Sequence, residues 1–191
     1  GNGTVGTKGV VSAANSLVGS TADDQVSSDF NGGVVALSNG NYLVRNSGWD
    51  NGSIVDTGAI TWGNGAGGTT GAVSASNSLV GSSANDQVGN TISCKVTELT
   101  NGNYVVSNSE WDLDGTHSNV GAVTWGNGGT GVKGPISAAN SLVGTSASAP
   151  VGDGYSDNYG ITALTNGNYV VSSPYWSADG TASNWGAATW G

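Results

Sequence analysis

Two groups of side chains in this sequence could do chemistry, and the first is a set of loop carboxylates. Asp112, Asp114 and Asp179 lie beside Asp-Gly turns or loop entrances. Clustered carboxylates can hold Ca²⁺ when nearby Asn and Ser oxygens complete six or more ligands, and paired ones can act as acid and base on a glycoside. The copies are uneven, because Asp50 matches Asp112 but Ser177 does not. The pattern therefore favours solvated turns, with calcium as an alternative.

The second group is aromatic. Trp49, Trp111 and Trp176 stand at recurring loop entrances. An indole ring offers a flat apolar face on which a sugar ring can stack, so these residues predict a shallow carbohydrate site in each copy. A further three tryptophans end an apolar strand motif and alternate with threonine, so we expect them to pack between neighbouring sheets: Trp62, Trp125 and Trp190.

Nothing else in the sequence predicts catalysis. His117 is the only histidine and has no acid or nucleophile at triad spacing. The Gly-x-Gly-x-x-Gly pattern occurs at 1–6, 63–68 and 126–131, but strand-like residues follow it, whereas a dinucleotide site needs a helix there. Cys94 stands alone and is expected to be a small buried hydrophobe. We therefore expect no enzyme and no obligatory cofactor.

The composition narrows the class of partner. Only 9% of the residues are charged and the net charge is −9. With four Lys and Arg in the whole chain there is no basic stripe for a nucleic acid or an anionic membrane surface. No apolar run approaches the roughly 20 residues of a membrane helix. The chain contains no Met, and we interpret it as a processed or truncated piece.

These residues are positioned by a hairpin that recurs three times. The stretch Thr-Asn-Gly-Asn-Tyr-Val-Val at 100–106 has near copies at 38–44 and 165–171. An Asn-Gly pair between β-branched runs is typical of a two-residue hairpin with a type I′ turn. The motif Asn-Ser-Leu-Val-Gly also recurs, starting at Asn15, Asn77 and Asn140, with spacings of 62 and 63 residues. The whole chain is therefore predicted to be a tandem repeat.

Each period contains four candidate strands, which in the middle copy are 92–99, 103–108, 121–125 and 135–143. Nothing recurs at helical spacing, so we predict an all-β chain. Three four-stranded antiparallel units of roughly 62 residues are typical of propeller blades, with a β-solenoid or a β-prism as alternatives. The repeat array fills residues 1–191, in units of about 9–70, 71–133 and 134–191, with 1–8 as the tail of a preceding unit.

The ends of the array are predicted to be complementary. Residues 9–19 are a fourth strand without its own blade, and the last unit lacks a fourth strand. Three blades are too few to close a propeller, which has about 4–8. We expect the propeller-like array to be open or completed by a neighbouring chain, head to tail, in a ring or a filament. The residues of the expected assembly strand are Val10, Val11, Leu17 and Val18.

A family resemblance supports the blade interpretation. The series Asn-Asp-Gln-Val-Gly at 85–89, Asn-Gly-Asn-Tyr-Val-Val at 101–106 and Gly-Ala-Val-Thr-Trp at 121–125 resembles FG-GAP repeats, the blades of integrin-type propellers. It is also similar to repeats of large bacterial surface proteins of the filamentous-haemagglutinin kind. The resemblance implies a propeller-like fold and an extracellular or cell-surface location. FG-GAP loops often bind calcium through aspartates, but here the hairpin loop is Asn-Gly-Asn.

The sequence therefore predicts a non-enzymatic extracellular structural or adhesion protein that assembles with itself. The alternative is a lectin-like propeller that binds surface glycans at one aromatic site per blade.

Overall fold

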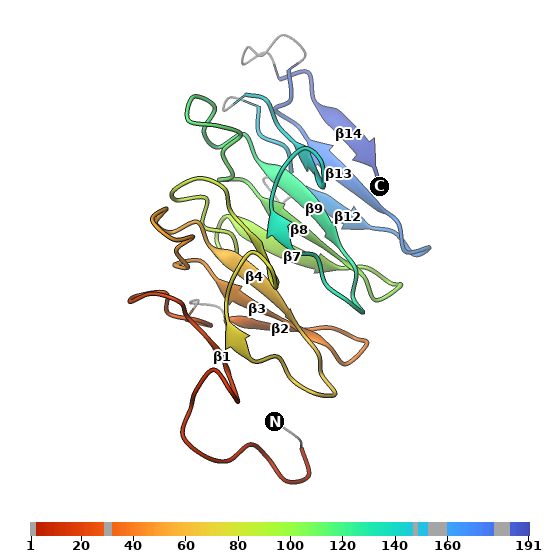
Figure 1. Cartoon of the computed structure of the whole chain (residues 1–191). Coiled ribbons are helices and arrows are strands. Elements are labelled where there is room, and N and C mark those ends of the chain that lie inside the picture. Colours follow the sequence, from red (N-terminus) through yellow and green to blue (C-terminus); the bar gives the residue numbers. More distant parts are fainter. Residues whose placement is uncertain (1–2, 29–31, 147–148, 153–159, 178–183) are drawn as a thin grey trace.

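The computed structural model describes residues 3–28, 32–146, 149–152, 160–177 and 184–191 (Figure 1). These residues form fourteen strands and no helix, so none of them belongs to a helix long and apolar enough to span a membrane. The strands are β1 (Leu17–Val18), β2 (Val34–Ala36), β3 (Tyr42–Asn46), β4 (Ala59–Gly63), β5 (Gly71–Ala72), β6 (Ser78–Val80), β7 (Cys94–Glu98), β8 (Tyr104–Asn108), β9 (Ala122–Gly126), β10 (Gly134–Pro135), β11 (Ser141–Val143), β12 (Ile161–Ala163), β13 (Tyr169–Ser173) and β14 (Ala187–Trp190).

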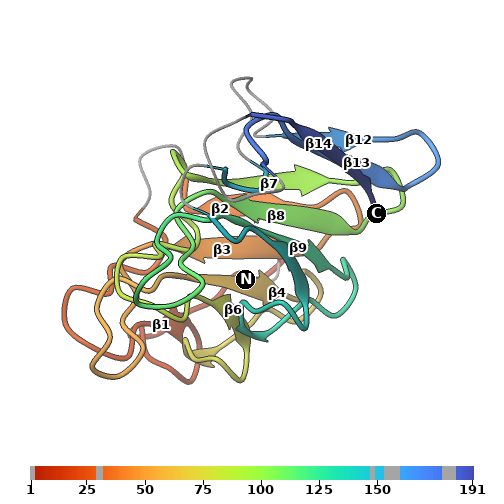
Figure 2. The same ribbon diagram turned by 90° about the horizontal axis from the view of Figure 1, so that it is seen from above.

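Three sheets follow one another along the chain and stack face to face (Figures 1 and 2). Their strand orders are β10-β6-β4-β3-β2, β11-β9-β8-β7 and β12-β13-β14, and β1 and β5 form a separate parallel pair. Apart from β10, neighbouring strands within each of the three sheets are antiparallel, which fits the blade prediction better than a solenoid. The all-β, blade-like fold is confirmed. The described part of the chain is an open stack that does not close into a ring.

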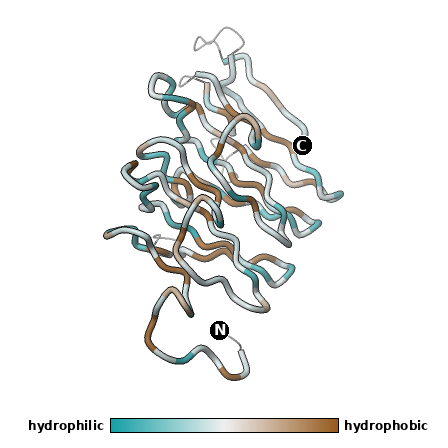
Figure 3. Tube along the Cα trace, viewed as in Figure 1, coloured by the Kyte–Doolittle hydropathy of each residue, from teal (hydrophilic) through white to brown (hydrophobic). Residues whose placement is uncertain are grey.

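Both faces of the middle sheet are covered by its neighbours. In β8 every residue is buried, and alternate side chains point to opposite faces. Tyr104 and Val106 belong to the apolar core shared with Leu43 of the first sheet. Val105 belongs to the core shared with Val171 of the third sheet. The central strand is therefore apolar on both sides, and the most hydrophobic stretches of the chain coincide with the strands of the stack (Figure 3).

The hairpin motif forms the predicted hairpins, but with a different turn. Leu99 N–H donates to Asn103 O at 2.8 Å, and Gly102 N–H donates to Leu99 O at 2.9 Å. Gly102 has a positive φ of 81°, while Asn101 does not have a positive φ. This is a three-residue loop, a type I turn followed by a left-handed glycine, and not a type I′ turn. Asn101 Oδ1 accepts the Asn103 N–H at 3.1 Å, and this bond holds the asparagine in the turn.

The predicted fourth strand at 135–143 is broken into β10 and β11. Asn140 causes the break, because its Oδ1 accepts the Ser137 N–H at 3.0 Å and its Nδ2 donates to Pro135 O at 3.0 Å. The side chain thus closes a turn within the stretch. As a result β10 pairs with β6 of the first sheet and β11 pairs with β9 of the second. One stretch of chain therefore bridges two blades.

Candidate assembly interface

Neighbouring repeats are joined in the same way at two places. At the first, β6 pairs antiparallel with β4, and the Thr61 and Ser78 hydroxyls lie 2.7 Å apart and buried. At the second, β11 pairs with β9, and the Thr124 and Ser141 hydroxyls also lie 2.7 Å apart. Each of these sheets takes its fourth strand from the next period of the sequence. The repeat junction is thus a strand exchange with a fixed register.

The residues just before each exchanged strand extend the junction. β5 pairs parallel with β1, and β10 pairs parallel with β6. The next residue in each case is Val73 or Ile136, and both are buried. Val73 shares an apolar cluster with Trp49 and Ala59, and Ile136 shares one with Trp111. Val73 and Ile136 follow two-residue strands and precede turns, but each is a core residue of the preceding blade.

The third-strand tryptophan supplies the side-chain contact between blades. Trp62 Nε1 donates to Gly128 O of the next repeat at 2.9 Å. Gly131 of the same loop packs against Trp62. A Cβ on this glycine would lie 2.5 Å from Trp62 Cβ, and its φ is +75°. Only glycine fits both conditions. The Gly-rich loop is thus the surface that covers the Trp62 indole, as expected for packing between blades. The expectation does not hold for Trp125, which is 43% exposed, or for Trp190, which is 69% exposed.

The hairpin tips form a ladder of asparagine side chains along the stack. Asn39 Nδ2 donates to Gly128 O at 2.8 Å and lies 3.5 Å from Gly102 O. Asn101 Nδ2 donates to Gly167 O at 3.1 Å. Each asparagine therefore binds the next repeat through Nδ2, while its Oδ1 closes its own turn. The Asn-Gly-Asn loop is built to stack repeats, which explains why it carries amides and not calcium-binding carboxylates.

At the N-terminal end of the stack one strand has an open edge. β1 holds Leu17 and Val18 of the predicted assembly strand and pairs only with β5 among the described strands. Val10 and Val11 lie outside any strand, so the predicted strand over 9–19 is shorter than expected. Val11 is 76% exposed, whereas Val73 at the same repeat position is 1% exposed. The difference arises because no described blade lies on this side.

At the C-terminal end the outer edge of β14 is open. In the first two sheets the equivalent strands, β4 and β9, carry β6 and β11 on that edge, but no described strand lies on β14. Trp190 is 69% exposed. Trp185 is also exposed, although its counterparts Thr57 and Val120 are fully buried. These large apolar side chains are left uncovered where a fourth strand would lie.

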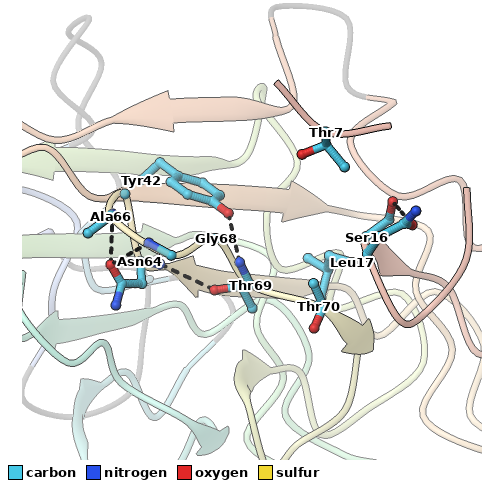
Figure 4. Close-up of a pocket in the computed structure, with 12 residues that line it drawn as sticks. Thr7, Ser16, Leu17, Tyr42, Asn64, Ala66, Gly68, Thr69 and Thr70 are labelled. Atoms are coloured by element: carbon cyan, nitrogen blue, oxygen red, sulfur yellow. Dashed lines mark hydrogen bonds between the residues drawn. The ribbon is translucent and has the colours of Figure 1, made fainter. Parts of the chain in front are cut away.

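A pocket of about 380 Å³ lies beside β1, between Ser16 and Leu17 on one side and the Gly-rich loop 64–70 on the other (Figure 4). Tyr42 closes its inner end and accepts the Thr69 N–H at 3.2 Å. The same place in the next repeat is lined by Trp62 and measures about 220 Å³. The pocket beside β1 is therefore the repeat position of a third-strand tryptophan, without the indole.

The predicted carbohydrate platforms are wrong for two of the three tryptophans. Trp49 and Trp111 are buried, and Trp49 Nε1 donates to Ser20 Oγ at 2.9 Å. Trp176 is half-buried. A buried ring offers no face to a sugar, so the aromatic residues at the loop entrances are core residues of the blades. The sequence around Trp49 and Trp111 does not predict their burial, because the residues that cover the two rings, Val73 and Ile136, come from the next repeat.

The predicted metal ligands use their oxygens on their own loops. Asp112 Oδ1 accepts the Asn119 N–H at 2.6 Å. Asp114 accepts the Thr116 N–H and hydroxyl and also contacts His117 Nδ1 at 2.9 Å, and these bonds hold its pKa far below the ordinary value. Asp179 lies outside the described residues. Among the residues that are described, no group of three or more His, Cys, Asp or Glu is arranged to hold a metal. The solvated-turn interpretation fits both described aspartates.

A different carboxylate has a structural role that sequence reasoning missed. Asp86 is fully buried, and it accepts the backbone N–H groups of Ser82, Ser83 and Asp112 at 2.7 to 2.9 Å. Burial raises its pKa to about 6 despite these bonds, and the charge of Asp112 adds to the rise. Asp24 closes the equivalent loop in the first repeat, and Ala149 stands there in the third. The recurrence of Asp24 and Asp86 was the available signal.

Cys94 is buried in the apolar core between the first two sheets, as predicted for a small hydrophobic residue.

The comparisons with known proteins agree with a tandem repeat. A family described as a repeat of unknown function, DUF5650, matches residues 1–28, 36–90, 98–153 and 163–191. The chain belongs to the DUF5650 repeat family. The two middle DUF5650 segments run from the end of one first strand to the loop beyond the exchanged fourth strand, and the two outer segments are about half as long. No curated protein and no solved structure matched the chain.

Proposed function

We propose that this chain is a structural repeat protein that assembles head to tail, with β1 of one copy completing the β14 sheet of another. The observation that carries the proposal is the match between the two open edges. Val11 is 76% exposed although its counterparts Val73 and Ile136 are buried, and Trp190 is 69% exposed although its counterpart Trp62 is half-buried. An uncovered sheet edge in water is an aggregation hazard that natural proteins pair or protect.

The internal junctions supply the register of the proposed contact. Thr61 pairs with Ser78 and Thr124 pairs with Ser141. A contact between copies with the same register would bring Thr189 of one copy opposite Ser16 of the next. By the same correspondence with the Ala59–Val80 and Ala122–Val143 pairs, Val18 would lie opposite Ala187. Pairing of these strands would satisfy the open backbone groups of both edges, as an added strand does in β-augmentation.

The pocket beside β1 is the expected site for the indole of Trp190 of a second copy. Trp62 donates to Gly128 O in the internal junction, and Gly65 is the matching carbonyl in that pocket. The two equivalent pockets measure about 380 and 220 Å³, and the smaller one already has the tryptophan in its wall. Trp190 of a second copy would therefore insert its indole into the position that Trp62 fills in the internal junction.

The wider assignment follows from this assembly. A stack of FG-GAP-like blades that continues through copy after copy would form a filament, or a ring if the rotation per copy closes. The low charged content, the Asn- and Gly-rich loops and the resemblance to surface-protein repeats support an extracellular location and a role in adhesion.

The test compares variants of exposed residues by size-exclusion chromatography with light scattering, followed by electron microscopy of the assembled fractions. Val11→Asp blocks the N-terminal edge and Trp190→Asp blocks the C-terminal edge, while Ile92→Asp adds the same charge at a site that is 70% exposed and outside both edges. We expect the wild-type chain and Ile92→Asp to form concentration-dependent assemblies. Each edge variant alone should be monomeric.

Mixing the two edge variants makes the test specific. Val11→Asp keeps an intact β14 edge and Trp190→Asp keeps an intact β1 edge, so an equimolar mixture should give a dimer and nothing larger. A monomeric wild-type chain at high concentration, or a mixture without dimers, would overturn the proposal.

A further inference from the structure

Arg45 is a buried cation that has no carboxylate partner among the described residues. It lies in β3 and is 6% exposed. Its Nη1 donates to Cys94 O of the next sheet at 3.2 Å, while its Nε is buried and has no hydrogen-bond partner. No carboxylate among the described residues forms a salt bridge with Arg45. A buried guanidinium of this kind is destabilising unless an anion compensates its charge.

The repeat shows that this cation is not needed for the fold. The residues at the position of Arg45 in the other two copies are Ser107 and Ser172. Ser107 is buried and its hydroxyl donates to Gly152 O at 3.1 Å, so a small hydroxyl satisfies the junction. Lys95 is a second departure, because Gly33 and Gly160 stand at its position in the other copies. A function specific to this junction would explain why both cations occur there.

The two side chains line one pocket of about 380 Å³. Its other described lining residues are uncharged: Gly32, Val34, Val35 and Thr91. Arg45 and Lys95 are two of the four Lys and Arg in a chain with a net charge of −9. Chance would rarely put half of so few cations on one pocket that no described acidic residue lines.

We propose that this pocket binds a small oxyanion, an inorganic phosphate or a small carboxylate. The Arg45 guanidinium would be its main partner, since a planar guanidinium binds both kinds of oxyanion through charge-assisted hydrogen bonds. The Lys95 ammonium adds positive charge to the wall of the pocket. Binding would neutralise the buried cation and tie the first sheet to the second, because Arg45 already donates to Cys94 O across that junction.

Thermal unfolding at constant ionic strength tests the proposal, with sodium chloride replaced stepwise by sodium phosphate in one series and sodium acetate in another. An anion that binds only the folded chain raises Tm with its concentration and then saturates. We expect this rise for the wild-type chain and for the control Lys133→Ser. We expect its loss in Arg45→Ser, and a several-fold weaker apparent affinity in Lys95→Gly. The stronger series tells whether the site prefers a tetrahedral or a planar anion.

Two further readouts keep the test decisive. Arg45→Ser restores the residue of the other repeats, so in chloride alone its Tm should equal or exceed that of the wild-type chain. In the wild-type chain, phosphate or acetate should shift the ¹⁵N–¹H resonance of Arg45 Nε. The proposal is overturned if the anions raise Tm equally in the wild-type chain and in Arg45→Ser, or if neither anion changes Tm or this resonance in the wild-type chain. The site lies within one chain, so the outcome does not depend on head-to-tail assembly.

Discussion

The indole nitrogen of Trp62 donates a hydrogen bond to Gly128 O, 66 residues further along the chain, at 2.9 Å. This contact joins two repeats and predicts a difference between equivalent tryptophans. Trp62→Ala should lower the free energy of unfolding by about 2–4 kcal/mol, because a covered aromatic ring is removed from a junction. Trp125→Ala should cost less than Trp62→Ala, since Trp125 is 43% exposed whereas Trp62 is half-buried. Urea unfolding curves measure both values, and equal losses would contradict the packing role of Trp62.

The loop that covers Trp62 should not tolerate a side chain at its closest point. Gly131→Ala places a methyl group 2.5 Å from Trp62 Cβ on a backbone with φ of +75°, so we expect a loss of about 2 kcal/mol or more. Gly115→Ala is the matched control, because its new methyl group would have no heavy atom within 4 Å and its φ is not positive. The control should change the midpoint of thermal unfolding by little. A similar shift in both variants would count against the close contact.

The asparagine ladder can be measured as a difference between two equivalent positions. Asn101 closes its own turn and also donates to Gly167 O, whereas Asn166 closes its turn with the Asn168 N–H and binds no further repeat in the described part of the chain. Asn101→Ala should therefore destabilise the chain by about 1 kcal/mol more than Asn166→Ala, the usual net value of one hydrogen bond. Chemical denaturation of a monomeric background such as Trp190→Asp gives both numbers. If the two variants lose the same stability, the ladder contributes nothing.

Asp86 should make the folded chain less stable as the pH rises through mild acid. Its folded-state pKa is raised to about 6, mainly by burial, from an ordinary value of 3.8. The folded state thus holds this proton more tightly than the unfolded state does, so the stabilisation is complete below about pH 4 and is lost between about pH 4 and pH 6. The full difference is on the order of 3 kcal/mol.

Urea unfolding of the wild-type chain and Asp86→Asn at pH 4.5 and pH 7.5 tests this assignment. The wild-type chain should lose more stability than the variant over this interval, because the variant carries no titrating group at that position. Asp24 acts in the opposite direction: burial raises its pKa, but hydrogen bonds from Thr21, Ser20 and Asp50 outweigh burial, and its net pKa is lowered. Its contribution is therefore lost only as the pH falls below about 4. Parallel slopes for the two proteins would show that another group titrates.

Head-to-tail assembly should be stronger in salt. Copies with a net charge of −9 repel one another, and added salt screens this repulsion while leaving apolar burial at the junction in place. Raising sodium chloride from about 20 to 300 mM, where the screening length falls below ~10 Å, should lower the concentration at which assemblies appear. Analytical ultracentrifugation at both salt concentrations measures the change. Dissociation in high salt would indicate an electrostatic contact in place of the apolar strand exchange.

Several elements could be predicted from the sequence, because the physics that decides them is local. The hairpins at 38–44, 100–106 and 165–171 follow from Asn-Gly pairs between β-branched runs, and their strands formed within a few residues of the expected limits. The repeat of about 62 residues and the absence of helical spacing required only a comparison of the sequence with itself. The predicted type I′ turn was wrong. The Asn101 side chain accepts a hydrogen bond within its own loop, and the preference of Asn-Gly pairs for type I′ turns takes no account of this bond.

The sequence by itself determined the period, the all-β class and the pairing within each hairpin, because turn chemistry and alternation act over a few residues. Only the tertiary structure decided which of the recurring residues are accessible. It buried Trp111, Asp86 and Arg45 and left Val11 and Trp190 exposed. Burial depends on which neighbouring repeat covers a residue, and copies with the same local sequence differ in whether that neighbour is present.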